Sequence, residues 1–246
     1  MKIISIIPAR MGSSRFPGKP LAKINGIPMI QHVYNNVKKN QLISDVVVAT
    51  CDKIIFDFVR SINGIAIMTS KKHKRASDRC YEAMRLLEKK RKIKYDIVVM
   101  VQGDEPMISS KMIGDSIQPL LNNKKIDIVN LICPINNKKD FEDPNFVKVV
   151  HDKNYNALYF SRAIIPYTKF RRGIYIRKQV CAIPFRRDFL IKYNKMKPTT
   201  LEKIESIDML RILENGYKVF LVETKNFAHA VDTKKDLLKV ANYLRK

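Results

Sequence analysis

The sequence is poor in cysteine and histidine, and the few that occur are widely separated. Each type occurs four times in 246 residues, and no two cysteines form a Cys-x-x-Cys pair. The cysteines are Cys51, Cys80, Cys133 and Cys181. This spacing argues against both a zinc site and a disulfide scaffold, and it favours a protein of the reducing cytoplasm.

The sequence also lacks long apolar runs and the standard glycine-rich phosphate motifs. Its apolar runs are too short for a transmembrane helix, and Met-Lys leads straight into an expected strand rather than a signal peptide. We therefore expect no membrane insertion. Neither Gly-x-Gly-x-x-Gly nor a Walker A motif is present. Because internal repeats and low-complexity linkers are also absent, we expect a single domain over residues 1–246.

Acidic residues are scarce, since 23 Asp and Glu stand against 47 Lys and Arg, a formal net charge of +24. Such a charge attracts polyanions, so a basic nucleic-acid-binding protein is the non-enzymatic alternative. The lysines, however, are spread along the whole chain, and no stripe interleaves them with aromatic residues. This distribution favours a generally solvated surface without a nucleic-acid partner.

Strand and helix patterns alternate over the first 135 residues. Apolar, β-branched runs predict strands at 3–7, 45–50, 66–69, 97–101 and 127–133. Apolar residues at helical spacing predict helices at 28–39, 54–62, 77–91 and 112–118. This alternation indicates an α/β fold with a mostly parallel sheet covered on both faces, whose ligands bind beyond the carboxyl ends of the strands.

The pattern changes after Pro134. Extended segments at 147–150, 157–160 and 179–185, with a basic loop at 169–177, predict a smaller antiparallel or mixed insertion at about 134–190. The rest of the chain predicts a helix at 200–213 with Thr200 as its N-cap, a strand at 219–222 and a helix at 235–244.

The loop Pro8–Leu21 follows the first predicted strand and is a candidate phosphate-binding site. It holds two glycines, two serines and the cations Arg10, Arg15 and Lys19. Glycines let the backbone approach a ligand, arginine grips phosphate with a planar fork, and lysine supplies a point charge. A surface turn that happens to be basic is the alternative, and composition alone leaves both open.

Carboxylates follow two other predicted strands. Asp104, in Gln102-Gly-Asp-Glu-Pro, directly follows the strand at 97–101, and it could hold Mg²⁺ opposite the basic loop or cap a turn before Pro106. Asp232 could be a second metal ligand on the same rim. Taken alone, it is better explained as the N-cap of the last helix.

Two further features leave their alternatives open. Arg162 lies among apolar residues and needs an anionic partner, either a structural Asp or Glu or a substrate carboxylate. Glu202, Glu205 and Asp208 recur every three residues on a predicted helix and would share a face. That face is either solvated, paired with lysine, or part of a pocket for a polyhydroxyl ligand.

These motifs together resemble a known family. The chain shows Pro-Ala-Arg-x-x-Ser-x-Arg-x-Pro-Gly-Lys-Pro-Leu, then Val-Gln-Gly-Asp-Glu-Pro-Met-Ile, Ala-Leu-Tyr-Phe-Ser-Arg-Ala-x-Ile-Pro and Val-Asp-Thr. In this order they are similar to 3-deoxy-manno-octulosonate (Kdo) cytidylyltransferases, or CMP-Kdo synthetases. The resemblance implies a Rossmann-like three-layer nucleotidyltransferase fold, with the insertion used for a homodimer. It also implies transfer of CMP from CTP to an acidic 2-keto sugar with Mg²⁺, for lipopolysaccharide or surface-polysaccharide synthesis.

The resemblance also implies roles for individual residues. Those expected at the nucleotide are Arg10, Ser13, Ser14, Arg15, Lys19, Ser77 and Arg79. Those expected at the sugar are Gln102, Arg162 and Gln179, to which the shared-face argument adds Glu205 and Asp208. The expected metal ligands are Asp104 and Asp232. Arg10, Lys19 and Asp104 are the expected catalytic residues.

Two segments depart from the family pattern. Arg75-Ala76 replaces a Ser-Gly pair near the expected nucleotide site. Gln179 replaces a histidine expected at the sugar, and Cys181 and Pro184 replace two glycines. The sugar could therefore be Kdo, an amino-modified Kdo or another 2-keto-3-deoxy acid, with a nine-carbon nonulosonate as the alternative.

Overall fold

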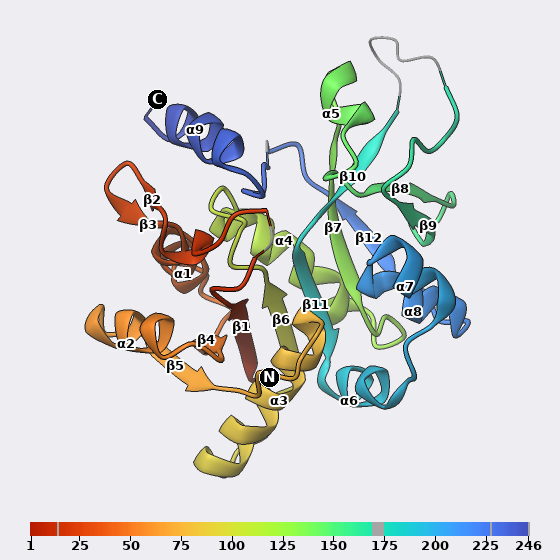
Figure 1. Ribbon diagram of the computed structural model, residues 1–246. Helices are drawn as coiled ribbons and strands as arrows, with labels where there is room; N and C mark the ends of the chain where they lie inside the picture. Colours follow the sequence, from red (N-terminus) through yellow and green to blue (C-terminus); the bar gives the residue numbers. More distant parts are fainter. Residues whose placement is uncertain (14, 169–174, 227, 246) are drawn as a thin grey trace.

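A five-stranded sheet forms the centre of the molecule (Figure 1). The computed structural model describes residues 1–13, 15–168, 175–226 and 228–245. The sheet order is β11-β6-β1-β4-β5. Its strands are β1 (Ile3–Ala9), β4 (Asp45–Thr50), β5 (Ile65–Met68), β6 (Ile97–Val101) and β11 (Ala182–Arg186). All neighbours are parallel except β11, which runs antiparallel to β6.

Helices cover both faces of this sheet, which confirms the predicted three-layer α/β fold. In β1, Ile4 and Ile6 point to one apolar core and Ile3 and Ile7 to the other, because side chains alternate along a strand. The helices α1 (Met29–Lys38), α2 (Lys53–Ser61) and α4 (Ser110–Asn122) pack on the side of Ile3. The other side is covered by α3 (Ala76–Arg91) and α6 (Arg187–Lys195).

A second five-stranded sheet, of order β12-β7-β10-β8-β9, lies beside the first (Figure 1). Its strands are β7 (Val129–Pro134), β8 (Lys148–His151), β9 (Ala157–Ser161), β10 (Arg177–Val180) and β12 (Phe220–Glu223). Only β12 and β7 are parallel, so the sheet is mixed, as predicted. However, β7 was expected in the parallel sheet and instead belongs here. The bounds of the insertion stay a prediction.

The predicted strand at 179–185 is wrong, because this segment divides between the two sheets. It ends β10 at Val180 and begins β11 at Ala182. Cys181 lies at the crossing, where its N–H donates to Glu105 Oε1 (3.1 Å) and its carbonyl accepts from the Gln102 N–H (3.1 Å). Apolar residues flank the crossing directly, with Val180 before it and Ala182 after it, so no turn residue marks the boundary.

The predicted helix at 200–213 is also two helices, α7 (Thr200–Glu205) and α8 (Asp208–Glu214). Ser206 separates them with a φ of 58°, in the left-handed region that does not continue a helix. The N-cap is Thr199 rather than Thr200, and its N–H donates to Glu202 Oε2 (3.2 Å). The short helix α5 (Lys138–Glu142) and α6 were not predicted.

The remaining elements flank the start and end of the chain. A hairpin of β2 (Lys23–Ile24) and β3 (Ile27–Pro28) lies near the last helix, α9 (Lys234–Tyr243). A 3₁₀ turn, η1 (Lys19–Leu21), ends the loop after β1. No helix among the described residues has the length and apolar character needed to cross a membrane.

Candidate active site

A cavity of about 390 Å³ lies where the two sheets meet. One part of its wall comes from the loops after β1 and β6, which leave the same edge of the central sheet because these strands are parallel. Another part comes from β10, the Cys181 crossing and the turn between α7 and α8. The predicted ligand rim therefore exists, and the second sheet closes it.

The loop Pro8–Leu21 places its cations along this cavity. Gly18, with a φ of 74°, donates its N–H to the Met11 carbonyl (3.0 Å) and so closes the loop before η1 orients Lys19. Arg10, Ser13, Arg15 and Lys19 all line the cavity. Ser14 lies outside the described residues.

Lys19 joins the two predicted metal carboxylates. Its Nζ lies 2.5 Å from Asp104 Oδ2 and 3.3 Å from Asp232 Oδ1, and it donates to the Val231 carbonyl (3.1 Å). The Val231 N–H donates to the Asp104 carbonyl (2.9 Å), which holds the two segments together. Burial acts to lower the pKa of Lys19, but the two carboxylates outweigh it and raise that pKa above its ordinary value.

Asp232 is not the N-cap of the last helix, so the alternative favoured from local sequence is wrong. Thr233 is the N-cap, and its hydroxyl accepts from the Asp236 N–H (3.2 Å) while Asp236 accepts from the Thr233 N–H (2.8 Å). The Asp232 carboxylate is left to face the cavity, where Arg15 Nη2 lies 2.8 Å from it.

The pair Asp104 and Asp232 fits a magnesium ion. Both present oxygen donors within reach of one ammonium group, that of Lys19, so they are close enough to act on a common cation. Mg²⁺ commonly uses one or two carboxylates and takes its other ligands from water and substrate phosphates. Among the described residues no group of three or more His, Cys, Asp and Glu could enclose a metal. The fit therefore depends on a phosphate-bearing ligand.

The predicted sugar residues divide into two groups. Gln102, Arg162, Gln179 and Asp208 line the cavity. Glu205 is not among the described residues that line the cavity. Its carboxylate accepts from the Ser161 hydroxyl (2.5 Å) and the Arg162 N–H (2.9 Å) instead. The Arg162 side chain donates to the carbonyls of Glu205 (2.9 Å) and Pro144 (3.0 Å) rather than to a structural carboxylate. A substrate carboxylate as its partner stays a prediction.

The shared face of Glu202, Glu205 and Asp208 does not exist, since Ser206 breaks the helix between them. Glu202 is fully buried and forms a two-pronged ion pair with Arg211 (2.5 and 2.7 Å). Asp208 accepts from the Ser77 hydroxyl (2.7 Å), and burial raises its pKa.

Of the two nucleotide residues predicted on α3, only one lines the cavity. Ser77 is fully buried, its hydroxyl is used by Asp208 and Tyr193, and it does not line the cavity as described. Arg79 does line the cavity and donates to Thr69 Oγ1 (2.5 Å).

Sequence reasoning gave no role to four charged residues of the cavity wall, Lys74, Arg75, Glu105 and Lys178. Arg75 Nε lies 3.3 Å from Glu202 Oε1 and 3.6 Å from Asp208 Oδ1. Glu105 is 3% exposed, and its Oε2 has no hydrogen-bond partner among the described residues. Burial and the nearby Asp104 raise the pKa of Glu105 to about 7, although the positive charge of Lys178 acts in the opposite direction. In sequence Lys178 stands between Arg177 and Gln179, so no local signal marks it as buried.

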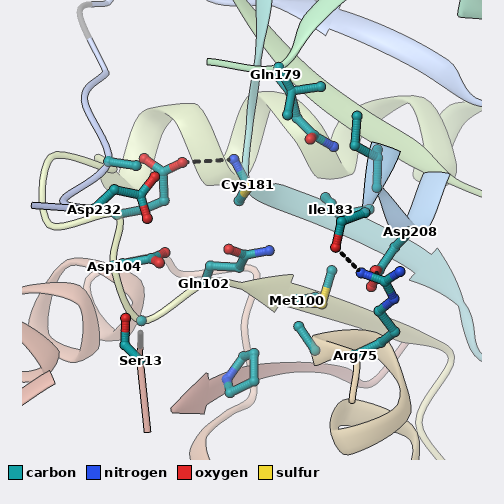
Figure 2. Close-up of a pocket in the computed structure, with 18 of the residues that line it drawn as sticks. Ser13, Arg75, Met100, Gln102, Asp104, Gln179, Cys181, Ile183, Asp208 and Asp232 are labelled. Atoms are coloured by element: carbon teal, nitrogen blue, oxygen red, sulfur yellow. Dashed lines mark hydrogen bonds and ion pairs between the residues drawn. The ribbon is translucent and has the colours of Figure 1, made fainter. Parts of the chain in front are cut away.

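Figure 2 shows how these groups are distributed across the cavity. Ser13, Asp104 and Asp232 lie toward one end, and Arg75 and Asp208 lie at the opposite end. Gln102 lies between the two ends, and Gln179 and Cys181 project from a further wall. The cavity can therefore hold an elongated ligand whose anionic part lies against the loop after β1.

A cationic loop and paired carboxylates at the edge of a Rossmann-like sheet define a nucleotide-binding transferase. The family model described as "Cytidylyltransferase" matches residues 4–224. The chain belongs to this cytidylyltransferase family, which confirms the resemblance and the enzyme interpretation.

Individual relatives and a solved structure show which cytidylyltransferases this chain is similar to. The chain is 42% identical to the 3-deoxy-manno-octulosonate cytidylyltransferase of Fusobacterium nucleatum subsp. nucleatum, covering 100% of this chain and 98% of that protein. It is 44% identical to the protein of the same name from Syntrophus aciditrophicus, with 99% and 97% covered. A CMP:2-keto-3-deoxy-manno-octonic acid synthetase complexed with CTP matches with a TM-score of 0.88 and 35% identity, covering 100% of this chain and 99% of that one.

Proposed function

We propose that this chain transfers CMP from CTP to an acidic 2-keto-3-deoxy sugar, 3-deoxy-manno-octulosonate or a close relative, and releases pyrophosphate. The observation that carries the proposal is the full-length match to a synthetase solved with CTP, combined with a cavity that has a cationic, carboxylate-bearing end. The proposed setting is the cytoplasm, in the synthesis of lipopolysaccharide or another surface polysaccharide.

The protein's part in this reaction is to position the reactants and to balance charge. The anomeric hydroxyl of the sugar attacks the α-phosphorus of CTP, and the bond to the pyrophosphate oxygen breaks. Arg10, Arg15 and Lys19 would hold the triphosphate and stabilise the negative charge that develops on pyrophosphate. Gln102, between the two ends of the cavity, would lie close to the attacking sugar.

Asp104 and Asp232 would hold Mg²⁺ at the same end. A bound Mg²⁺ would neutralise charge on the triphosphate oxygens and help to orient them. Lys19 contacts both carboxylates, so its ammonium supplies positive charge at the same place. Arg15 pairs with Asp232, which would bring its guanidinium to the phosphates from the same side.

The side chain of Gln179 indicates which sugars should be compared as substrates. Gln179 lines the cavity and its amide donates to Asn130 Oδ1 (2.6 Å), so the orientation of the side chain is fixed. A fixed amide presents a set of hydrogen-bonding groups different from that of an imidazole. This difference supports testing Kdo beside its amino-modified form and a nonulosonate.

The proposal is tested by measuring pyrophosphate release from CTP and Mg²⁺ with these acidic sugars. We expect release with Kdo or its amino-modified form, and a preference for CTP over UTP and ATP. If none of the sugars supports release, the proposal is wrong. If only the nonulosonate does, the substrate assignment moves to that class.

The proposal includes a homodimer. Apolar side chains are exposed on β9 and in the segment after it, where Leu158 is 61%, Ile164 43% and Tyr167 93% exposed. A second copy covering this region would bury them. Sedimentation velocity should give a dimer mass for the wild type and a monomer for Leu158→Asp combined with Tyr167→Asp, and a wild-type monomer would contradict this part.

A further inference from the structure

Lys178 is a buried cation in the wall of the active-site cavity. It is 4% exposed and lies on β10 directly before Gln179. Its Nζ lies 4.0 Å from the centroid of the Phe146 ring. A lysine is rarely buried to this extent, because removing the ammonium from water is costly unless negative charge or a π-face compensates.

The strand alternation separates Lys178 from the cation beside it. Arg177 points to the other face of β10, where its Nη2 lies 2.8 Å from Glu223 Oε1 and its guanidinium stacks on Tyr175. Arg177 is therefore neutralised outside the cavity. Lys178 points to the inner face, close enough to Glu105 for its charge to act on that carboxyl.

The two other cations near this wall hold the backbone. Lys148 is fully buried, and its Nζ donates to the carbonyls of Asp143 (3.0 Å), Phe146 (2.9 Å) and Arg162 (2.6 Å). Arg162 donates to two carbonyls of its own. Lys148 thus fixes the segment that carries Phe146, the ring against which Lys178 packs.

From this arrangement we infer that the Lys178 ammonium binds the carboxylate of the acidic sugar substrate. The inference rests on the proposed function and names the residue that selects an acidic over a neutral sugar. A carboxylate at this place would be screened from water by Phe146 and would lie beside Gln179. Arg162, for which the sequence left a structural and a substrate carboxylate open as partners, keeps a structural role in this inference, since it holds the turns at Pro144 and Glu205.

The test compares Kdo with its methyl ester, which lacks the negative charge, at saturating CTP and Mg²⁺. Pyrophosphate release is measured for the wild type, Lys178→Met, Lys178→Arg and Arg162→Met, with the exposed Lys153→Met as a matched control. Losing one charge-assisted hydrogen bond should raise the KM for Kdo about 10-fold to 150-fold in Lys178→Met. The KM for CTP should stay within about twofold of the wild type, as expected when only a sugar contact is lost.

The deciding quantity is the ratio of kcat/KM for the acid to kcat/KM for the ester. We expect this ratio to fall to about one in Lys178→Met, to recover largely in Lys178→Arg, and to persist in Arg162→Met and Lys153→Met. A ratio that persists in Lys178→Met but is lost in Arg162→Met overturns the inference and leaves the proposed function standing. A wild type that releases no pyrophosphate with any acidic sugar overturns the proposed function, and the inference with it.

A second variant is available if Lys178→Met does not fold, since Lys178 is buried. Met fills most of the lysine volume and makes favourable contacts with the Phe146 ring, so the variant should fold. If circular dichroism shows that it does not, Lys178→Gln keeps a polar side chain without the charge, and the same ratio decides in that variant.

Discussion

Breaking the buried ion pair between Glu202 and Arg211 by removing one partner should cost several kcal/mol of stability, in the α7–α8 region beside the Arg75 end of the cavity. Both side chains are buried, at 0% and 3% exposed, and they meet in a two-pronged contact of 2.5 and 2.7 Å. Replacing one partner of such a pair leaves an uncompensated buried charge, which typically costs about 3–5 kcal/mol. Asp78 remains 3.7 Å from Arg211 Nη1, so we expect Glu202→Gln to cost about 3 kcal/mol, the lower end of that range.

The measurement is the free energy of unfolding in urea, with thermal melting as a second probe. In a chain of this size, a loss of about 3 kcal/mol should lower Tm by about 6–12 °C. Asp57→Asn is the matched control, because it breaks a solvent-exposed pair with Lys53 and should cost less than about 0.5 kcal/mol. A Glu202→Gln variant as stable as this control would refute the claim that removing Glu202 leaves an uncompensated buried charge on Arg211.

The same variant should also affect catalysis, because Arg75 lies 3.3 Å from Glu202 and forms part of the cavity wall. A double-mutant cycle with Arg211→Met measures the coupling free energy between Glu202 and Arg211. Removing both partners should be less harmful than Glu202→Gln alone, since no buried charge then remains unpaired. Additive losses would mean that the two residues act independently.

Three further predictions concern Asp104 and Arg15, at the carboxylate-bearing end of the cavity, and the buried Lys148. Asp104→Asn should lower kcat at least 100-fold at saturating Mg²⁺, measured by pyrophosphate release, and activity within tenfold of the wild type would contradict a role in holding the metal. Arg15→Met should raise the KM for CTP about 10-fold, because the proposed phosphate contact is lost together with the pair to Asp232, while the KM for the sugar changes little. Burial lowers the pKa of Lys148 to about 8 from its ordinary 10.5, so the unfolded chain binds more protons between these pH values and stability should rise with pH there. The difference in unfolding free energy between wild type and Lys148→Met from pH 7.5 to 10.5 isolates this effect, and a difference that falls with pH would contradict the assignment.

The end of the cavity that holds Lys19 and Asp104 could be predicted from sequence because its signals are local. The strands at 45–50 and 97–101 have the bounds expected from their apolar runs. Parallel strands bring the loops after β1 and β6 to one edge, so the meeting of Lys19 and Asp104 follows from the alternation of strands and helices. Asp232 needed the resemblance, because its local pattern looks like an N-cap.

The course of the chain at the β10–β11 crossing and between α7 and α8 could not be predicted, because contacts between distant parts of the sequence determine it. The division between β10 and β11 depends on Glu105, which accepts the Cys181 N–H from a distant part of the chain. The break between α7 and α8 occurs at Ser206, where no glycine marks the left-handed conformation. Glu205 and Ser77 turn away from the cavity for the same reason, since their partners come from β9 and α8.

The passage of one segment through both sheets limits how this cavity can diverge among related proteins. Side chains alternate along β10 and β11, so inserting or deleting one residue at Cys181 would exchange the inner and outer faces of one strand. Lys178 would then leave the cavity, or Ile183 would leave the core. Changes in sugar preference here must therefore arise by substitution at constant length, whereas exposed turns such as the one at Asn154 tolerate changes in length.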